Sequence, residues 1–271
     1  MRLGTLSFAV ALTTVIGAGN FAEAEVLRVG GTGAATEMLR QLGAKFSDAS
    51  KIQVEVIPSL GSTGAIDAVA DGVLDFAVTS RALKPDERAK GLKQAWALRT
   101  PYGLVTSRRN PDGMRTAEVA EVFKAANPRW SDGERIRIIL RPIVDSSTGY
   151  MNTAFPGMTA ATEAARLRPD VSIAATDQDN ADLAESLEGS LSGATLTQIK
   201  MEKRNLRFVA LDGVEPTLRN FEKGIYPFGM PLFVIVSSKK NSAVECFIAF
   251  LQSSQGVAAL READILAAVE P

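Results

Sequence analysis

Short β-branched runs alternate with stretches of helical hydrophobic spacing along the first third of the chain. The runs at residues 26–31, 51–59 and 73–80 predict strands. Between them, residues 36–49 and 61–72 carry apolar side chains three and four positions apart, which predicts two amphipathic helices. Strand, helix, strand, helix and strand in this order predict an α/β fold with a parallel or mixed sheet.

The remainder of the chain carries the same two patterns less regularly. Pro101 interrupts one expected strand, and Asn127–Pro128 marks the end of one expected helix. Residues 157–205 are polar and rich in Ala, Asp and Glu, and they predict no clear element. The pattern predicts helices at residues 86–94, 117–130 and 149–155, strands at 97–110, 135–143, 206–217 and 225–240, and two final helices within 241–265 separated at Gln255–Gly256.

The composition is that of an ordinary globular protein. The 271 residues are 46% hydrophobic and 23% charged, which suits one large domain or two of medium size. The formal net charge of −1 provides no global basic field, so we expect no nucleic acid partner and no anionic membrane surface. Any bound anion must therefore be held by local geometry.

Two residue types that carry much enzyme chemistry are scarce. The chain has no histidine, which excludes histidine bases, Ser–His–Asp triads and histidine metal ligands. The single cysteine, Cys246, excludes an intramolecular disulfide, and its place in a helical apolar run predicts a small core residue. Because carboxylates are not clustered either, we expect no catalytic residue, no metal and no cofactor, and an enzyme is only the third hypothesis.

The first residues have the pattern of an export signal. Arg2 precedes an apolar run at residues 6–18, and Ala22-Glu23-Ala24 matches an A-x-A cleavage pattern. The run is short for a membrane span, and a buried N-terminal helix is the alternative. We expect a signal peptide at residues 1–24 and a periplasmic, monomeric mature protein, without a lipid anchor because no cysteine stands at the cleavage point.

Three turns rich in glycine and hydroxyl residues each follow a strand and open a helix. They are GGTGAAT at residues 30–36, LGSTGA at 60–65 and VDSSTG at 144–149. A helix N-terminus presents unpaired backbone N–H groups, and in open α/β sheets such turns lie where ligands bind. Helix capping is the alternative use of each hydroxyl. Three such turns in one chain favour an oxyanion site that needs no basic surface.

Taken together, these turns resemble the phosphate-binding proteins of ABC transporters, which are type II periplasmic binding proteins. Beyond GGTGAAT, the resemblance rests on LGSTGAIDAVADGVLDFAVTSRAL at residues 60–83, LRPIVDSSTG at 140–149 and LDGVEPTLRNFEKGIYPFGMPLFVIVSS at 211–238. These stretches follow the family's order over almost the whole mature chain.

The resemblance implies a two-lobed α/β fold with mixed sheets flanked by helices, in which the lobes close over a ligand on two hinge strands. Lobe 1 would comprise residues 25–104 and 227–271, and lobe 2 residues 105–226. The resemblance also implies that the protein captures a small oxyanion, phosphate or phosphate-like, and presents it to an ABC permease in the inner membrane.

Carried over position by position, the resemblance implies ligand contacts from all three turns and from the end of the third strand. The family aspartate that accepts a proton from phosphate falls on Ser80, and Arg141 stands one place before the family arginine. The alternative for Arg141 is a surface ion pair, and for Arg81 it is solvation at the lobe edge. The implied contacts are Ala35, Thr36, Ser62, Thr63, Ser80, Arg81, Arg141, Ser146, Ser147 and Thr148.

Two hypotheses of different class follow. The first is an exported solute-binding protein for a small oxyanion. The alternative is a secreted sensor or scaffold partner of the same fold with a degenerate cleft. Ser80 in place of the aspartate and the shifted register of Arg141 favour the alternative, because both change the groups that a phosphate would meet.

Overall fold

The computed structural model describes residues 25–268, and the expected signal peptide at residues 1–24 lies outside them. Helices and strands of the first third alternate as predicted, and β1 pairs in parallel with β2 on one side and β3 on the other. These elements are β1 (Val26–Gly31), the 3-10 turn η1 (Gly33–Ala35), α1 (Thr36–Ser50), β2 (Gln53–Ile57), α2 (Gly61–Ala70) and β3 (Phe76–Thr79).

One long strand, β4 (Leu92–Thr106), follows the short helix α3 (Pro85–Ala89). The sequence pattern extended this helix to residue 94 and broke the strand at Pro101, and both predictions are wrong. Pro101 is the last residue of β4 that pairs with β9 (Gly229–Ser237), and pairing with β7 (Ser190–Thr195) begins at the next residue. Pro101 thus stands at the last position of one ladder and directly before the first position of the next, so it does not lie in the interior of either ladder.

The region that shows no clear sequence pattern folds around a second set of parallel strands. β5 (Arg137–Leu140) lies between β6 (Ser172–Ile173) and β7, and it runs parallel to both. The helix predicted at 117–130 already ends at Lys124. The other elements of this region are η2 (Thr116–Glu118), α4 (Val119–Lys124), α5 (Ser146–Ala154), α6 (Met158–Arg166), α7 (Asp177–Ser186), α8 (Leu196–Met201), β8 (Arg207–Phe208) and α9 (Leu218–Glu222).

The C-terminal residues form α10 (Ser242–Gln252), α11 (Ser254–Glu262) and β10 (Leu266–Ala267). The two helices separate at Ser253 and not at Gln255–Gly256 as predicted. The Ser253 hydroxyl caps α11 by accepting a hydrogen bond from the Gly256 N–H at 3.1 Å. Within the described residues no single helix is long and apolar enough to cross a membrane, and α10 and α11 pass that test only as a pair bent by 72°.

Cys246 is exposed, so the prediction of a core cysteine is wrong. The buried face of α10 consists of Ala243, Val244, Phe247 and Leu251. Cys246 directly precedes Phe247 and therefore points about 100° away from it around the helix. The apolar run in the sequence of α10 therefore includes residues, such as Cys246, that do not belong to its buried face.

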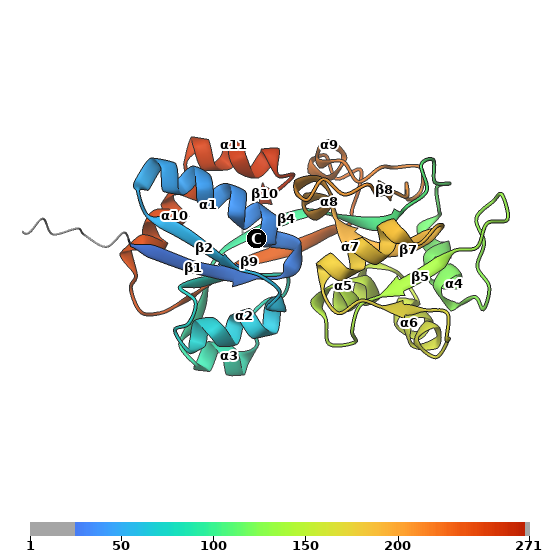
Figure 1. Ribbon diagram of the computed structural model, residues 1–271, viewed down its shortest axis with the longest axis horizontal. Coiled ribbons are helices and arrows are strands. Elements are labelled where there is room, and N and C mark those ends of the chain that lie inside the picture. Colours follow the sequence, from blue (N-terminus) through green and yellow to red (C-terminus); the bar gives the residue numbers. More distant parts are fainter. Residues whose placement is uncertain (1–24, 269–271) are drawn as a thin grey trace, which may run out of the picture.

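The strands join into one ten-stranded mixed sheet in the order β2-β1-β3-β9-β4-β7-β5-β6, with β8 and β10 paired to β4. Helices cover this sheet in two groups at opposite ends of the molecule (Figure 1). The first core is built from residues within 27–98 and 232–265, and the second core from residues within 102–230. β4 and β9 contribute buried side chains to both cores. The lobe limits at residues 104 and 227 stay a prediction.

A substitution of Phe247 tests whether the first core is assigned correctly. Phe247 is fully buried, and its ring centroid lies 5.0 Å from those of Phe46 and Phe76. We expect Phe247→Ala to lower the free energy of unfolding by about 3–5 kcal/mol, because it removes both contacts and leaves a cavity. Urea denaturation followed by circular dichroism measures this change. Val257→Ala on α11, where the side chain is 41% exposed, is the control and should change the value by less than about 0.5 kcal/mol. Equal effects of the two variants would contradict the assigned core.

Candidate functional site

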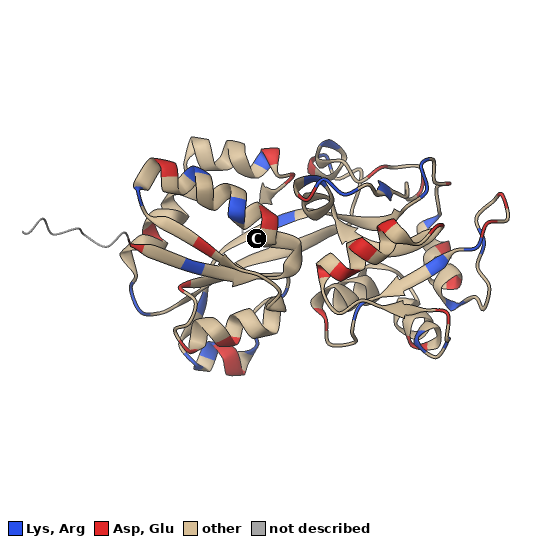
Figure 2. Cartoon of the chain, in the orientation of Figure 1, with Lys and Arg blue, Asp and Glu red and all other residues tan. Residues whose placement is uncertain are grey.

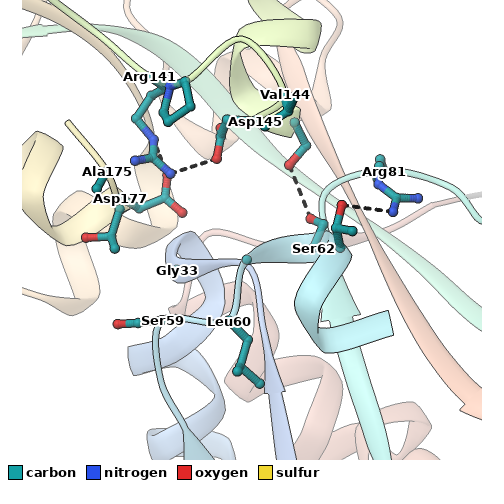
Figure 3. Close-up of a pocket in the computed structure, with 15 residues that line it drawn as sticks. Gly33, Ser59, Leu60, Ser62, Arg81, Arg141, Val144, Asp145, Ala175 and Asp177 are labelled. Atoms are coloured by element: carbon teal, nitrogen blue, oxygen red, sulfur yellow. Dashed lines mark hydrogen bonds and ion pairs between the residues drawn. The ribbon is translucent and has the colours of Figure 1, made fainter. Parts of the chain in front are cut away.

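A cavity of about 220 Å³ lies between the first core and the second core. Its walls come from the turn before α1, the start of α2, the residue after Ser80, the β5–α5 connection and the start of α7 (Figure 3). The lining residues are Gly33, Ser59, Leu60, Gly61, Ser62, Thr63, Arg81, Arg141, Pro142, Val144, Asp145, Ser146, Ala175, Thr176 and Asp177. The cavity therefore collects helix N-termini from both cores.

Three serine hydroxyls from separate elements meet at the edge of this cavity. Ser80 Oγ lies 2.6 Å from Ser146 Oγ and 3.2 Å from Ser62 Oγ. Ser62 Oγ lies 3.2 Å from Ser146 Oγ and also accepts a hydrogen bond from the Ser80 N–H at 3.0 Å. Ser62 and Ser80 belong to elements of the first core and Ser146 to an element of the second. The structure thus brings three of the predicted site residues together.

The helix that carries Ser62 offers backbone donors as well. Gly61, its first residue, has a left-handed φ of 64°, which turns the chain from β2 into α2. No side chain of the described residues caps this N-terminus, and Gly61, Ser62 and Thr63 line the cavity. By contrast, Asp145 caps α5 by accepting a hydrogen bond from the Ser147 N–H at 2.9 Å. The start of α2 therefore borders the cavity with uncapped N–H groups.

Arg81 lines the cavity but is held by an acidic partner. Its guanidinium donates two hydrogen bonds to the Glu87 carboxylate, at 2.6 and 2.9 Å, and one to the Thr63 hydroxyl at 3.1 Å. The hydrogen bond from Arg81 lowers the pKa of Glu87 to about 2. Arg81 is therefore not simply solvated, and the buried Glu87 fixes its position in the cavity wall.

Arg141 is nearly buried and stands between two carboxylates. Its Nη2 donates a hydrogen bond to Asp145 Oδ2 at 2.7 Å, and its Nη1 donates to the Ala174 carbonyl at 2.8 Å. Its Nε lies 3.5 Å from Asp177 Oδ1 and makes no hydrogen bond to the described residues. Arg141 thus lies in the cavity wall rather than in a surface ion pair, with its charge already countered.

Asp177 is the main site residue that sequence reasoning missed. It is the first residue of α7, and its Oδ2 accepts a hydrogen bond from the Ala34 N–H at 3.0 Å. Burial raises the pKa of Asp177, and the charge of Arg141 opposes that rise. One sequence signal could have located it. Thr176 and Asp179 form a capping box, with the Thr176 hydroxyl accepting from the Asp179 N–H at 3.0 Å, and this motif marks a helix start.

The other four predicted ligand contacts are either buried or hydrogen-bonded to other groups of the protein. Ala35 and Thr36 are buried and do not line the cavity. Ser147 donates its hydroxyl to Asp145, and Thr148 donates its hydroxyl to a backbone carbonyl of the β5–α5 connection at 2.9 Å. Ligand contacts by these four residues stay a prediction.

The charges around the cavity nearly cancel. Arg81 and Arg141 line it together with Asp145 and Asp177, and Glu87 pairs with Arg81. Figure 2 shows acidic and basic residues mixed over both ends of the molecule, in keeping with the net charge of −1. Within residues 25–268, no three His, Cys, Asp or Glu residues are grouped so that they could hold a metal ion. The polar groups that line the cavity are hydroxyls, backbone N–H groups, two arginines and two aspartates.

Solved structures of other proteins share this architecture. A putative phosphate ABC transporter substrate-binding protein with bound phosphate from Clostridium perfringens is 17% identical, with a TM-score of 0.75 over 90% of this chain and 100% of that chain. An ABC-type phosphate transport receptor from Vibrio cholerae is 18% identical, with a TM-score of 0.62 over 89% and 99%. The tungstate binding protein TupA from Desulfovibrio alaskensis G20 is 13% identical, with a TM-score of 0.58 over 91% and 100%. These likenesses confirm the predicted type II periplasmic binding protein fold.

The amino-acid sequence itself also matches a protein family. A search of the curated proteins finds no match. A family model described as the PBP superfamily domain matches residues 17–255, which include all three glycine-rich turns. Since this match spans most of the chain, the protein belongs to the PBP superfamily.

Proposed function

We propose that the protein is an exported solute-binding protein that captures a small oxyanion, phosphate or phosphate-like, between its two cores for an ABC transporter. The observation that carries this proposal is the meeting of Ser62, Ser80 and Ser146, whose hydroxyl oxygens lie 2.6–3.2 Å apart. Hydroxyls gathered in this way can turn toward one oxyanion without adding net charge. The fold shared with a phosphate-bound structure from Clostridium perfringens supports the proposal.

The start of α2 strengthens the case for an anion. Its first N–H groups border the cavity without a side-chain cap among the described residues, and a helix N-terminus favours negative charge. Each hydrogen bond to a charged partner is worth about 1.5–3 kcal/mol. A few such bonds suffice to hold a small anion in a protein whose net charge is −1.

Ser80 bears on which anion the cavity accepts. A carboxylate at this position would accept a proton and so favour a protonated oxyanion, whereas a serine hydroxyl both donates and accepts. Anions without a proton, such as sulfate, molybdate and tungstate, therefore belong in the set of candidate ligands beside phosphate.

One observation favours a second candidate function. Arg141 is paired with Asp145 and faces Asp177, and Asp177 itself accepts the Ala34 N–H. A cavity in which donors are satisfied by the protein's own carboxylates suits a secreted sensor or scaffold partner of the same fold, with a degenerate cleft.

A panel of anions tests the first function. We expect one of phosphate, arsenate, sulfate, molybdate, tungstate and simple phosphonates to raise the melting temperature of the mature protein, because a ligand that binds only the folded state stabilises it. At a ligand concentration of 100 Kd this gain is about 2.7 kcal/mol. Differential scanning fluorimetry at several pH values measures the shift. No shift with any of these anions would overturn oxyanion capture and leave the second function.

The serine cluster can be tested with the anion that this panel selects. We expect Ser146→Ala to weaken its binding by at least about tenfold, because one hydrogen bond to a charged oxygen is lost. Isothermal titration calorimetry measures the affinity. Thr153→Ala is the matched control on the same helix, since Thr153 is exposed and donates its hydroxyl to the Gly149 and Tyr150 carbonyls. If Ser146→Ala binds as tightly as this control, the cluster is not the ligand site.

A further inference from the structure

The carboxylate of Asp177 reaches from the second core to a turn of the first. Its Oδ2 accepts the Ala34 N–H at 3.0 Å, in the turn that leads into α1. The Thr32 hydroxyl donates to the same oxygen at 3.4 Å. An anionic group of the protein itself thus occupies two donors of the first glycine-rich turn, the Ala34 N–H and the Thr32 hydroxyl.

Gly33 allows the carboxylate to come this close. A Cβ atom at Gly33 would lie 2.7 Å from Asp177 Oδ2, 2.7 Å from Gln178 Oε1 and 2.9 Å from Asp177 Cβ, so both side chains would have to move away from the turn. Gln178 Nε2 in turn donates a hydrogen bond to the Gly33 carbonyl at 3.0 Å. Two consecutive side chains of α7 therefore fit this turn, so the contact is a specific part of the interface between the two cores.

The carboxylate of Asp177 also faces Arg141, one of the two arginines that line the cavity (Figure 3). Asp177 Oδ1 lies 3.5 Å from Arg141 Nε, the buried donor that makes no hydrogen bond to the described part of the chain. Asp145 accepts a hydrogen bond from the same guanidinium at 2.7 Å. An oxyanion entering the cavity thus meets one arginine between two carboxylates, and the like charge of Asp177 opposes it.

We propose that Asp177 is a specificity-determining residue of this cavity, because its carboxylate competes with a ligand oxyanion for Arg141 and for the donors of the first turn. This inference rests on the proposed function and deepens it. The cavity binds an oxyanion weakly while Asp177 is ionised. It binds the same oxyanion more tightly once Asp177 is protonated, because the like charge is gone and the Nε of Arg141 is left to the ligand.

The surroundings of Asp177 give the direction of the pH dependence. Burial raises the pKa of Asp177, the charge of Asp145 adds to the rise, and Arg141 opposes it. As the pH falls through this raised pKa, the folded protein takes up a proton at Asp177, and the affinity for an anion rises. The charged and titratable groups that face it are Arg141 and Asp145 beside α5, Tyr102 on β4 and, through Gln178, Glu202 after α8.

Sulfate and inorganic phosphate are suitable probes, because sulfate keeps its charge over the pH range in which phosphate titrates. Isothermal titration calorimetry at about pH 5.5 and about pH 8 compares the wild type with Asp177→Asn and Asp182→Asn. Asparagine keeps the shape and an acceptor for the Ala34 N–H but removes the charge. Asp182 is the matched control on the same helix, because it is 64% exposed and pairs with Arg204.

We expect wild-type affinity for sulfate to be higher at about pH 5.5 than at about pH 8, because the pKa of Asp177 is raised and protonation removes one like charge as the pH falls. Asp177→Asn should bind sulfate equally tightly at both pH values, and at least about tenfold more tightly than the wild type at about pH 8. Asp182→Asn should follow the wild type. Binding of sulfate or phosphate by Asp177→Asn alone would also support the proposal, since the wild-type cavity would then be blocked by its own carboxylate.

Two results would overturn the proposal, and they have different consequences for the proposed function. If the wild type binds sulfate or phosphate but Asp177→Asn binds it no more tightly at about pH 8, Asp177 does not compete, and the proposed function stands without it. If neither the wild type nor either variant binds these two anions, the same comparison is made with the anion that the panel selects. If no anion of the panel binds, the proposed function fails, and this inference fails with it. Circular dichroism checks folding of Asp177→Asn, and Asp177→Ser provides the same comparison if the asparagine variant is unfolded.

Discussion

The antiparallel pairing of β4 with β9 is the constraint on which the rest of the structure depends. These strands pair from residue 92 to residue 101 of β4, and β4 then continues into the second core, where it pairs with β7. Tyr226 fastens the junction, because its buried hydroxyl donates a hydrogen bond to the Tyr102 carbonyl at 2.8 Å. Since this continuous sheet sets the spacing of the two cores, turns far apart in the sequence can meet between them.

Helices and strands were predictable from the sequence wherever large apolar side chains recur at the spacing of one of the two. Met38, Leu42 and Phe46 form such a stripe on α1, and all are buried. Residues 157–205 have no such stripe, because α6, α7 and α8 bury mainly small or polar side chains, among them Ala161, Ala165, Ala184, Asn180 and Thr197. In α7, which buries Asn180, Ala181 and Ala184, such side chains leave little hydrophobic contrast to detect. The pattern at Pro101 failed for another reason, because whether a proline breaks a strand depends on which partner strand lies opposite it.

In the candidate site, the hydroxyls were predictable and their acidic neighbours were not. Ser62 and Ser146 stand in local strand–turn–helix patterns, and the structure places both at the cavity edge. Glu87 and Asp177 stand in ordinary acidic stretches, and what gives each its role is a partner brought near by packing, namely Arg81 and the turn before α1. Local sequence can therefore indicate where donors for an anion lie. The net charge that an anion meets depends on tertiary contacts.

The contribution of each group to the affinity for an anion depends on the hydrogen bond or ion pair that the group gives up when the anion binds. The serine hydroxyls now bond to one another, so a ligand oxyanion would replace neutral hydrogen bonds by charge-assisted ones, which are about twice as strong. Arg141 already has Asp145 and Asp177 as anionic neighbours, and exchanging one anion for another gains little. Affinity at this cavity should therefore come chiefly from the hydroxyls and the start of α2. Arg141, Asp145 and Asp177 would then determine which anion, in which protonation state, can compete with the two carboxylates for the arginine.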